Sequence, residues 1–138
     1  MSEIAALSAR ERTCQSRIDE LTRVLDSLAD FRNQVSASRV DFEDQLRDKV
    51  RRARKASGLS GRLAKKYAEK TVGYLMGEFG HGMADDFTEV DAQAAAATAR
   101  ADEELRRELA RLASIREQIR AERAREQAER AARQAVGR

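Results

Sequence analysis

The sequence of 138 residues contains no proline and no tryptophan, and it has only one cysteine and one histidine. Without proline, no residue obliges a helix to end or kink. The single cysteine, Cys14, cannot form an intrachain disulfide, and it falls on an apolar stripe where a small hydrophobic side chain fits. We therefore predict that Cys14 is buried. The single histidine, His81, has no second histidine or cysteine nearby, so we predict a surface residue and no metal site.

Patterns typical of catalysis are also missing. No glycine-rich phosphate loop follows a strand pattern, no nucleophile elbow occurs, and no histidine is placed to activate Cys14. The sequence therefore predicts a protein that is not an enzyme, with no cofactor and no small-molecule substrate.

Long hydrophobic runs are absent as well. No segment approaches the roughly 20 consecutive apolar residues of a membrane span. The N-terminus, Met1 to Ile4, begins neither a positively charged region nor an apolar core of the kind found in signal peptides. We expect a cytoplasmic protein with no signal peptide and no membrane span; export together with a partner stays open.

The residues that are abundant favour helix. Apolar residues make up 41% of the chain, but 25 of them are Ala, and charged residues of both signs make up 37%. Ala, Arg, Glu, Leu and Gln lose little side-chain freedom in a helix, whereas strand-favouring residues are sparse. The length fits one domain, so we predict a single all-α domain over residues 1–138.

A heptad pattern runs through the first part of the chain and predicts a helical arm over about residues 3–56. One core position is occupied by Ile4, Ile18, Leu25, Leu46 and Ala53, and the other by Leu7, Cys14, Leu21, Leu28, Val35, Phe42 and Ala56. Polar residues interrupt the pattern at Glu11, Arg32, Arg39 and Lys49. Such interruptions set the register of paired helices or mark where their contacts stop.

The segment 57–61, with two glycines and two serines, predicts a turn, and a second helical arm follows over about residues 61–120. The glycines at 80–82 allow a kink there. An apolar stripe that we expect to pair back on the first arm consists of Leu105, Leu109, Leu112, Ile115 and Ile119. The predicted fold is a long antiparallel two-helix hairpin resembling a coiled coil, with a solvated or frayed tail over residues 120–138.

Two helices bury one stripe each, so apolar residues off the stripe should remain exposed unless another chain covers them. These residues are Val24, Phe31, Val40, Val50 and Tyr74. We therefore predict association into a helical bundle, with a second copy of the chain or with a different protein.

Charge is distributed unevenly. Residues 47–70 carry ten basic and two acidic groups, whereas residues 71–99 carry five acidic groups and no Lys or Arg. Arg51, Arg52, Arg54 and Lys55 could bind an anion, and nucleic acid is one alternative. No base-reading motif accompanies them, and cations also suit the end of a helix, so nucleic-acid binding is the less favoured interpretation. The acidic run could instead meet the basic end of another chain.

The stretch from Leu59 through Gly61 and Ala64 to Tyr67 resembles the turn of the WXG-motif (ESAT-6-like) helical hairpins of type VII secretion, which read W-x-G-x-x-A-x-x-F/Y. Leu59 stands in place of the tryptophan, and the C-terminal tail lacks the family's Tyr-x-x-x-Asp/Glu export signal. Two long helices flank this turn in the family, and the longer members that accompany LXG toxins have a first arm of similar length.

The resemblance implies a small partner, chaperone or targeting factor that binds the helical N-terminal domain of a secreted effector. The residues expected to bind such a partner are Leu59, Gly61, Ala64, Tyr67, Leu105, Leu109, Leu112 and Ile119. Two alternatives remain. The chain could be a structural coiled-coil scaffold or assembly factor, or Gly61, Ala64 and Tyr67 could serve ordinary helix packing.

Overall fold

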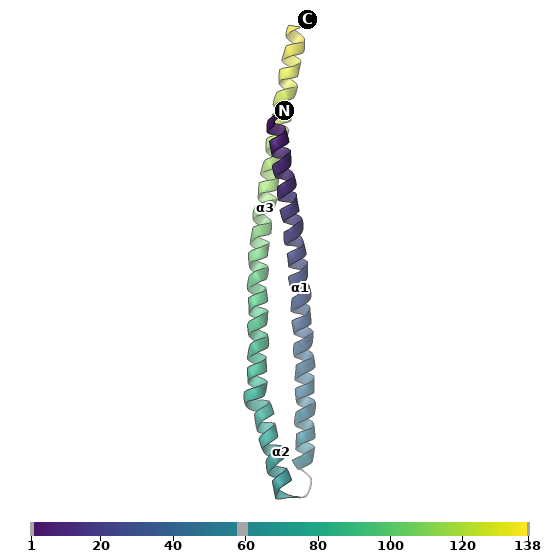
Figure 1. Cartoon of the computed structure of the whole chain (residues 1–138), viewed down its shortest axis with the longest axis vertical. Coiled ribbons are helices and arrows are strands. Elements are labelled where there is room, and N and C mark those ends of the chain that lie inside the picture. Colours follow the sequence, from purple (N-terminus) through teal and green to yellow (C-terminus); the bar gives the residue numbers. More distant parts are fainter. Residues whose placement is uncertain (1, 58–60, 138) are drawn as a thin grey trace. The chain divides into compact units, whose positions relative to one another are not determined.

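The computed structural model describes residues 2–57 and 61–137, and all of these except Gly61 and Gly137 are helical (Figure 1). The elements are α1 (Ser2–Ser57), α2 (Arg62–Tyr74), the π-helical turn η1 (Leu75–Phe79) and α3 (Gly80–Val136). No strand occurs in the described ranges, so the predicted all-α fold is confirmed. The chain divides into two compact units: unit 1 is Met1–Ser27 with Thr98–Arg138, and unit 2 is Leu28–Ala97. A single domain over residues 1–138 stays a prediction.

Unit 1 is an antiparallel pair of helical segments from α1 and α3 (Figure 1). Ion pairs between described residues join the segments: Arg125 Nη2 lies 3.2 Å from Glu3 Oε2, Arg116 Nε 3.2 Å from Glu11 Oε2, and Arg17 Nη2 2.9 Å from Glu104 Oε2. The residue numbers rise along α1 as they fall along α3. This order fixes the antiparallel direction.

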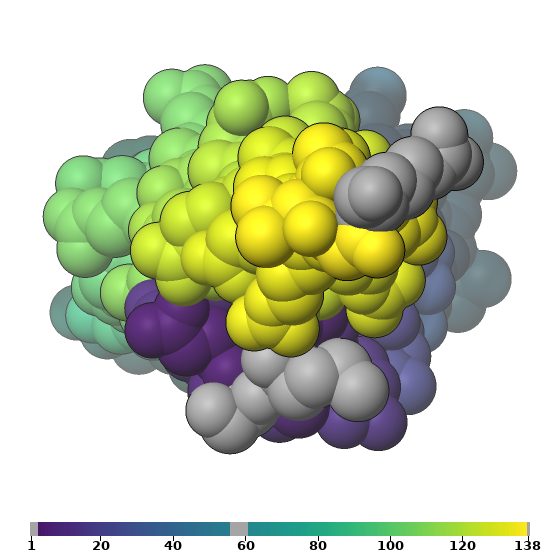
Figure 2. All heavy atoms as spheres, turned by 90° about the horizontal axis from the view of Figure 1, so that it is seen from above, coloured from purple at the N-terminus to yellow at the C-terminus, as the bar shows by residue number. Residues whose placement is uncertain are grey.

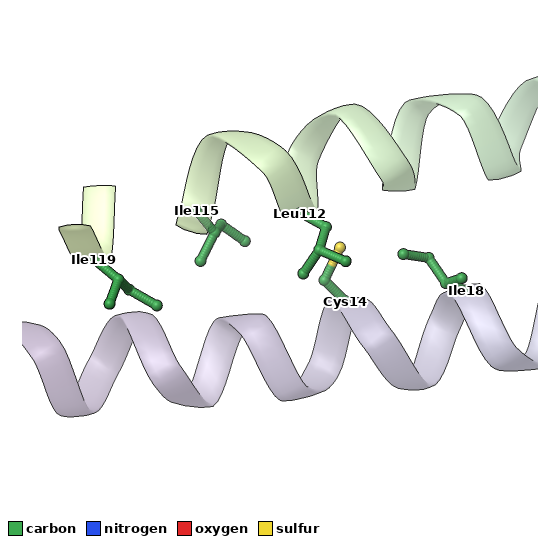
Figure 3. Packing of buried hydrophobic residues seen from close by; sticks show 5 residues of the cluster. All are labelled: Cys14, Ile18, Leu112, Ile115 and Ile119. Atoms are coloured by element: carbon green, nitrogen blue, oxygen red, sulfur yellow. The ribbon is translucent and has the colours of Figure 1, made fainter. Parts of the chain in front are cut away.

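The core of unit 1 forms where the predicted heptad stripe of α1 meets the apolar stripe of α3 (Figure 3). Its members are Cys14, Ile18, Leu112, Ile115 and Ile119, with Leu7 and Leu105 packed against them. Ile115 is only 2% exposed. Burying a side chain of this size contributes roughly 1.5–3 kcal/mol. The burial of Cys14 and the pairing of Leu105, Leu112 and Ile119 with the first arm are therefore confirmed, whereas the expectation for Leu109 is wrong, because Leu109 is 48% exposed.

Two of the polar interruptions in the heptad pattern bind across the helix pair. Glu11 pairs with Arg116 in unit 1, and in unit 2 Arg32 Nε donates to Asp91 Oδ1 at 3.1 Å. Arg39 instead pairs within its own helix, with Glu43. Glu11 and Arg32 thus link the facing helix at fixed positions, as expected of groups that set register.

The C-terminal part of α3 is a solvated helix. It continues to Val136 and passes the start of α1, and Figure 2 shows its atoms uncovered at this end of unit 1. Val136 is 87% exposed. The predicted solvated tail is therefore present, but it is not frayed before Val136. Strong helix formers and ion pairs one turn apart, such as Arg125 with Glu122, support the helix without a facing partner.

Unit 2 is also antiparallel: residues 28–57 of α1 face α2, η1 and the start of α3. Phe42 lies with its ring centroid 5.7 Å from that of Phe79 and 5.8 Å from that of Phe87. Near the end of α1, Arg54 Nη2 lies 3.5 Å from Met76 Sδ. The chain therefore reverses between α1 and α2, which confirms the hairpin. Of the predicted turn, residues 58–60 lie outside the described part.

The kink predicted at residues 80–82 occurs a few residues earlier. The irregular turn is η1, where Gly77 departs from helical dihedrals with φ −93° and ψ −109°, whereas Gly80 to Gly82 belong to regular α3. Gly80 is nevertheless essential to this turn: a Cβ there would lie 2.5 Å from the carbonyl oxygen of Leu75. The widened turn brings this carbonyl against the Cα of Gly80, and only glycine fits such an approach.

The prediction that Val50 is exposed is wrong, because Val50 is only 8% exposed. The heptad pattern assigned the core position to Lys49, which is exposed in the structure. After Phe42 the next large apolar residues of α1 that face inward are Leu46 and then Val50, at intervals of four residues. A straight helix has 3.6 residues per turn, so its inward stripe drifts away from a strict seven-residue repeat.

Candidate protein-binding surface

Helix α2 carries an apolar stripe that the described chain leaves exposed. Leu63 is 83% exposed, Tyr67 75% and Tyr74 55%. Their spacing of four and seven residues puts them on one face of the helix. We call these three residues the α2 stripe. An aligned row of large apolar side chains in water differs from single exposed residues, which are common on protein surfaces.

The core-facing side of α2 is a different face. Ala68, 2% exposed, and Leu75, at the start of η1, are its buried residues. Ala64 is exposed, and Gly61, directly before the helix, has φ +130°, a conformation that favours glycine. Ordinary packing within the hairpin therefore does not explain Ala64 or Tyr67. That alternative interpretation of the WXG-like pattern is wrong for these two positions.

A shallow groove of about 300 Å³ lies between α1 and α3 in unit 2. Its lining is mostly apolar: Phe31, Gln34, Val35, Ser38, Met83, Asp86, Phe87 and Val90. Phe31 and Val90 are exposed, as Val24 and Val40 are elsewhere on the chain. The predicted exposure of Val24, Phe31, Val40 and Tyr74 is therefore confirmed. We call this feature the α1/α3 groove.

The α2 stripe and the acidic rim of the α1/α3 groove share one side of unit 2. On α2, Tyr67 comes directly before the buried Ala68, and on α3, Asp86 comes directly before the half-buried Phe87. Both helices run in the same direction along α1, so a residue preceding a core residue points to the same side in each. Across the widened turn η1 the inward residues Leu75, Phe79, Met83 and Phe87 follow at intervals of four, where a regular α-helix averages 3.6 residues per turn.

The two helices that carry these features differ in charge, although only Asp86 of the carboxylates lines the groove. On α2 the cations are Arg62, Lys65, Lys66 and Lys70, and Glu69 is the one acid of that helix. On α3, Asp85, Asp86 and Glu89 follow one another with no Lys or Arg among residues 80–97. Within the described residues, none of these four cations and three carboxylates takes part in an ion pair.

The other predicted partner-binding residues are divided between the core and the surface. Leu112 and Ile119 are buried in the core of unit 1, and Leu105 packs against it, so α1 of the same chain already covers them. Leu109 is exposed. Leu59 lies outside the described residues. Sequence reasoning did not single out Leu63, although it lies four residues before Tyr67 on the same helix face.

The predicted anion-binding residues lie along the end of α1. Arg51, Arg54 and Lys55 line a groove of about 860 Å³ together with Met76. Asp48 offsets part of their charge, because it pairs with Arg51 and its Oδ2 lies 3.1 Å from Arg52 Nη2. The hydrogen bond from Arg51 lowers the pKa of Asp48 below its ordinary value, with further help from the neighbouring cations. The local charge available to an external anion is therefore smaller than the sequence suggests.

The described residues were also compared with the requirements of a metal site, a reactive thiol and a membrane span. They contain no cluster of three or more His, Cys, Asp or Glu that could hold a metal ion, and His81 is an exposed residue of α3. The thiol of Cys14 donates to the backbone carbonyl and the Oε2 of Glu108, at 3.2 and 3.1 Å. Burial, and then Glu108, raise the pKa of Cys14. None of the described helices has an apolar stretch suited to crossing a bilayer.

Comparison with known proteins identifies no relative: no family, no curated protein and no solved structure matches the chain.

Proposed function

We propose that this chain is a non-enzymatic interaction module that binds another helical protein chain. The α2 stripe is the observation that carries the proposal. Leu63 and Tyr67 are largely in water on one helix face, Tyr74 beside them stacks on Phe79 and is still 55% exposed, and aromatic residues of this kind anchor protein interfaces. A chain with so few bulky residues leaves this row outside its own core.

A more specific proposal concerns the class of partner. Tyr67 and Ala64 belong to the WXG-like pattern and are exposed next to a helical reversal. We propose that the partner is the helical N-terminal domain of a type VII secretion effector, for which this chain acts as a chaperone or targeting factor. The support is the pattern of residues together with the exposure of its aromatic member.

The test is a binding titration. The chain is mixed with the helical N-terminal domain of an effector encoded beside its gene, and the affinity is measured by isothermal titration calorimetry. We expect Leu63→Lys with Tyr67→Lys to weaken binding at least about tenfold, because loss of buried anchors typically costs more than 1 kcal/mol each. Val136→Lys is the matched control, since Val136 is equally exposed but lies in the tail.

The proposal is refuted if the unmodified chain binds no such domain and also remains a monomer at micromolar concentration. It is also refuted if binding occurs but the double variant retains the affinity of the control. Circular dichroism of each variant checks that the helices are intact.

A further inference from the structure

We propose that helix α2 is a docking surface for an anionic membrane, with the α2 stripe lying in the headgroup layer and the lysines beside it contacting lipid phosphates. This inference goes beyond the proposed function, because it assigns a lipid ligand to the end of unit 2 at which the chain reverses. A bilayer and an effector domain would compete for Tyr67, so the two ligands bind in turn.

Two lysines of α2 lie beside the α2 stripe. Lys66 comes three residues after Leu63, and Lys70 comes three residues after Tyr67 and four before Tyr74. Residues at these spacings are neighbours on a helix surface. Both lysines are exposed, and neither has a carboxylate partner within the described chain. Lysines in such a position lay their aliphatic stems along apolar neighbours and hold the ammonium group in the polar layer.

The composition of α2 is that of an interfacial helix. Helices that lie in a membrane surface combine basic residues on a polar face with leucine or aromatic residues on an apolar one. Tyrosine suits this depth, because its ring is apolar and its hydroxyl stays with the headgroups. Nucleic acid binds such cations through its phosphates. It would leave Leu63, which is 83% exposed, in water, so the apolar row favours a lipid surface.

The charge distribution in unit 2 turns this end toward an anionic surface. Residues 47–70 carry ten basic and two acidic groups, and the reversal brings the end of α1 beside α2 (Figure 1). Cations near an anionic surface are attracted, whereas carboxylates are repelled. The start of α3, over residues 80–97, has no Lys or Arg and carries Asp85, Asp86, Glu89 and Asp91.

The first experiment measures binding of the full chain to large unilamellar vesicles by flotation. One set of vesicles contains phosphatidylcholine alone, and the other contains equal parts of phosphatidylcholine and phosphatidylglycerol. We expect binding to the anionic vesicles to be at least about tenfold tighter, because the cations of unit 2 gain attraction only from anionic lipid.

Two double variants separate the charged from the apolar part of the surface. Lys66→Glu with Lys70→Glu should weaken binding to the anionic vesicles at least about tenfold. Leu63→Ser with Tyr67→Ser leaves the net charge unchanged and should also weaken binding at least about tenfold, because less apolar area enters the membrane surface.

Each variant has a matched control that should bind as the unmodified chain does. Arg12→Glu with Arg23→Glu makes the same change in net charge at exposed positions of unit 1. Val24→Ser with Val40→Ser removes exposed apolar side chains of α1. Circular dichroism without vesicles checks that every variant keeps its helix content.

The second experiment uses the absence of tryptophan from the sequence. Tyr67→Trp and Val40→Trp each place a single tryptophan at an exposed position of unit 2, the first on α2 and the second on α1. On anionic vesicles the emission of Tyr67→Trp should shift to shorter wavelength as the ring leaves water. The emission of Val40→Trp should not shift.

Three results would overturn the inference: an unmodified chain that does not bind anionic vesicles, binding that withstands either double variant, and equal emission shifts at the two tryptophan positions. Binding lost in the lysine variant alone would indicate attraction to phosphates without insertion, as expected of a nucleic-acid-binding protein. None of these results decides the proposed function, because the titration with the effector domain contains no lipid.

Discussion

Replacing Gly80 with alanine tests the description of the irregular turn η1. In a regular, exposed helix, Gly→Ala stabilises the protein by about 1 kcal/mol, because the unfolded chain loses freedom. At Gly80 the added Cβ would lie 2.5 Å from the carbonyl oxygen of Leu75 and 3.3 Å from Cδ2 of Leu46. The first of these contacts is with backbone, which cannot move aside as the end of a side chain can.

Forcing extra volume into a packed position typically costs about 1–3 kcal/mol. The clash at Gly80 should therefore outweigh the gain from helix propensity, and we expect Gly80→Ala to reduce the free energy of unfolding by about 1–2 kcal/mol. Gly73→Ala and Gly82→Ala are the matched controls, because a Cβ at either position meets no atom within 4 Å. Both should raise the free energy of unfolding by up to about 1 kcal/mol.

The assay is urea denaturation followed by far-ultraviolet circular dichroism. All variants are compared at one protein concentration, because any association adds to apparent stability. The reasoning is refuted if Gly80→Ala is as stable as Gly73→Ala. That result would mean that the turn relaxes to a regular helix at little cost.

Three further predictions concern single side chains. Ile115→Ala should lower the free energy of unfolding by about 2–4 kcal/mol, whereas Leu109→Ala, at an exposed site of the same helix, should change it by less than about 1 kcal/mol, as measured by urea denaturation. The thiol of Cys14, with its raised pKa and buried site, should react with a thiol reagent at neutral pH far more slowly in the native protein than in urea; equal rates would contradict the burial. The folded-state pKa of Asp48 is lowered, so its contribution to stability is present above its unfolded pKa and is lost as the pH falls through the folded value. Asp48→Asn and Arg51→Ala should therefore each reduce the fall in melting temperature at acid pH, as measured by thermal melts over a pH series.

The fold was largely predictable because its signal is periodic. Cys14, Ile18 and Leu21 follow the heptad and are buried, since two long helices can hide apolar residues only along a shared stripe. Lys49 and Val50 mark where this reasoning failed. A strict repeat cannot represent the gradual rotation of a straight helix, and one residue of drift exchanges a core position for a surface one.

The position of the irregular turn was less predictable. Four glycines occur from residue 73 to residue 82, and the close pair at 80 and 82 led us to place the kink there. What separates Gly77 and Gly80 from the others is backbone geometry: one leaves the helical dihedrals and the other contacts a carbonyl of the preceding turn. Such distinctions depend on atoms that a sequence pattern does not specify.

The candidate surface was predictable in part. Tyr67 was expected to bind a partner, and its exposure is consistent with that role. Leu112 and Ile119 were assigned to a partner from the same apolar spacing, yet they are covered by α1 of their own chain. The spacing of apolar residues predicts that a helix face is buried, but it does not determine whether the same chain or another chain buries it.

The additional residue in the turn η1 determines which side chains of the following helix face outward. Deleting one residue between Leu75 and Phe79 would allow continuous α-helix through this region, with more regular backbone hydrogen bonding. The deletion would also rotate the next turns of α3 by about 100° relative to α2, given 3.6 residues per turn. Asp86 would then turn away from the side on which Tyr67 lies. A chain with the more regular backbone would therefore present Tyr67 and Asp86 on different sides of unit 2.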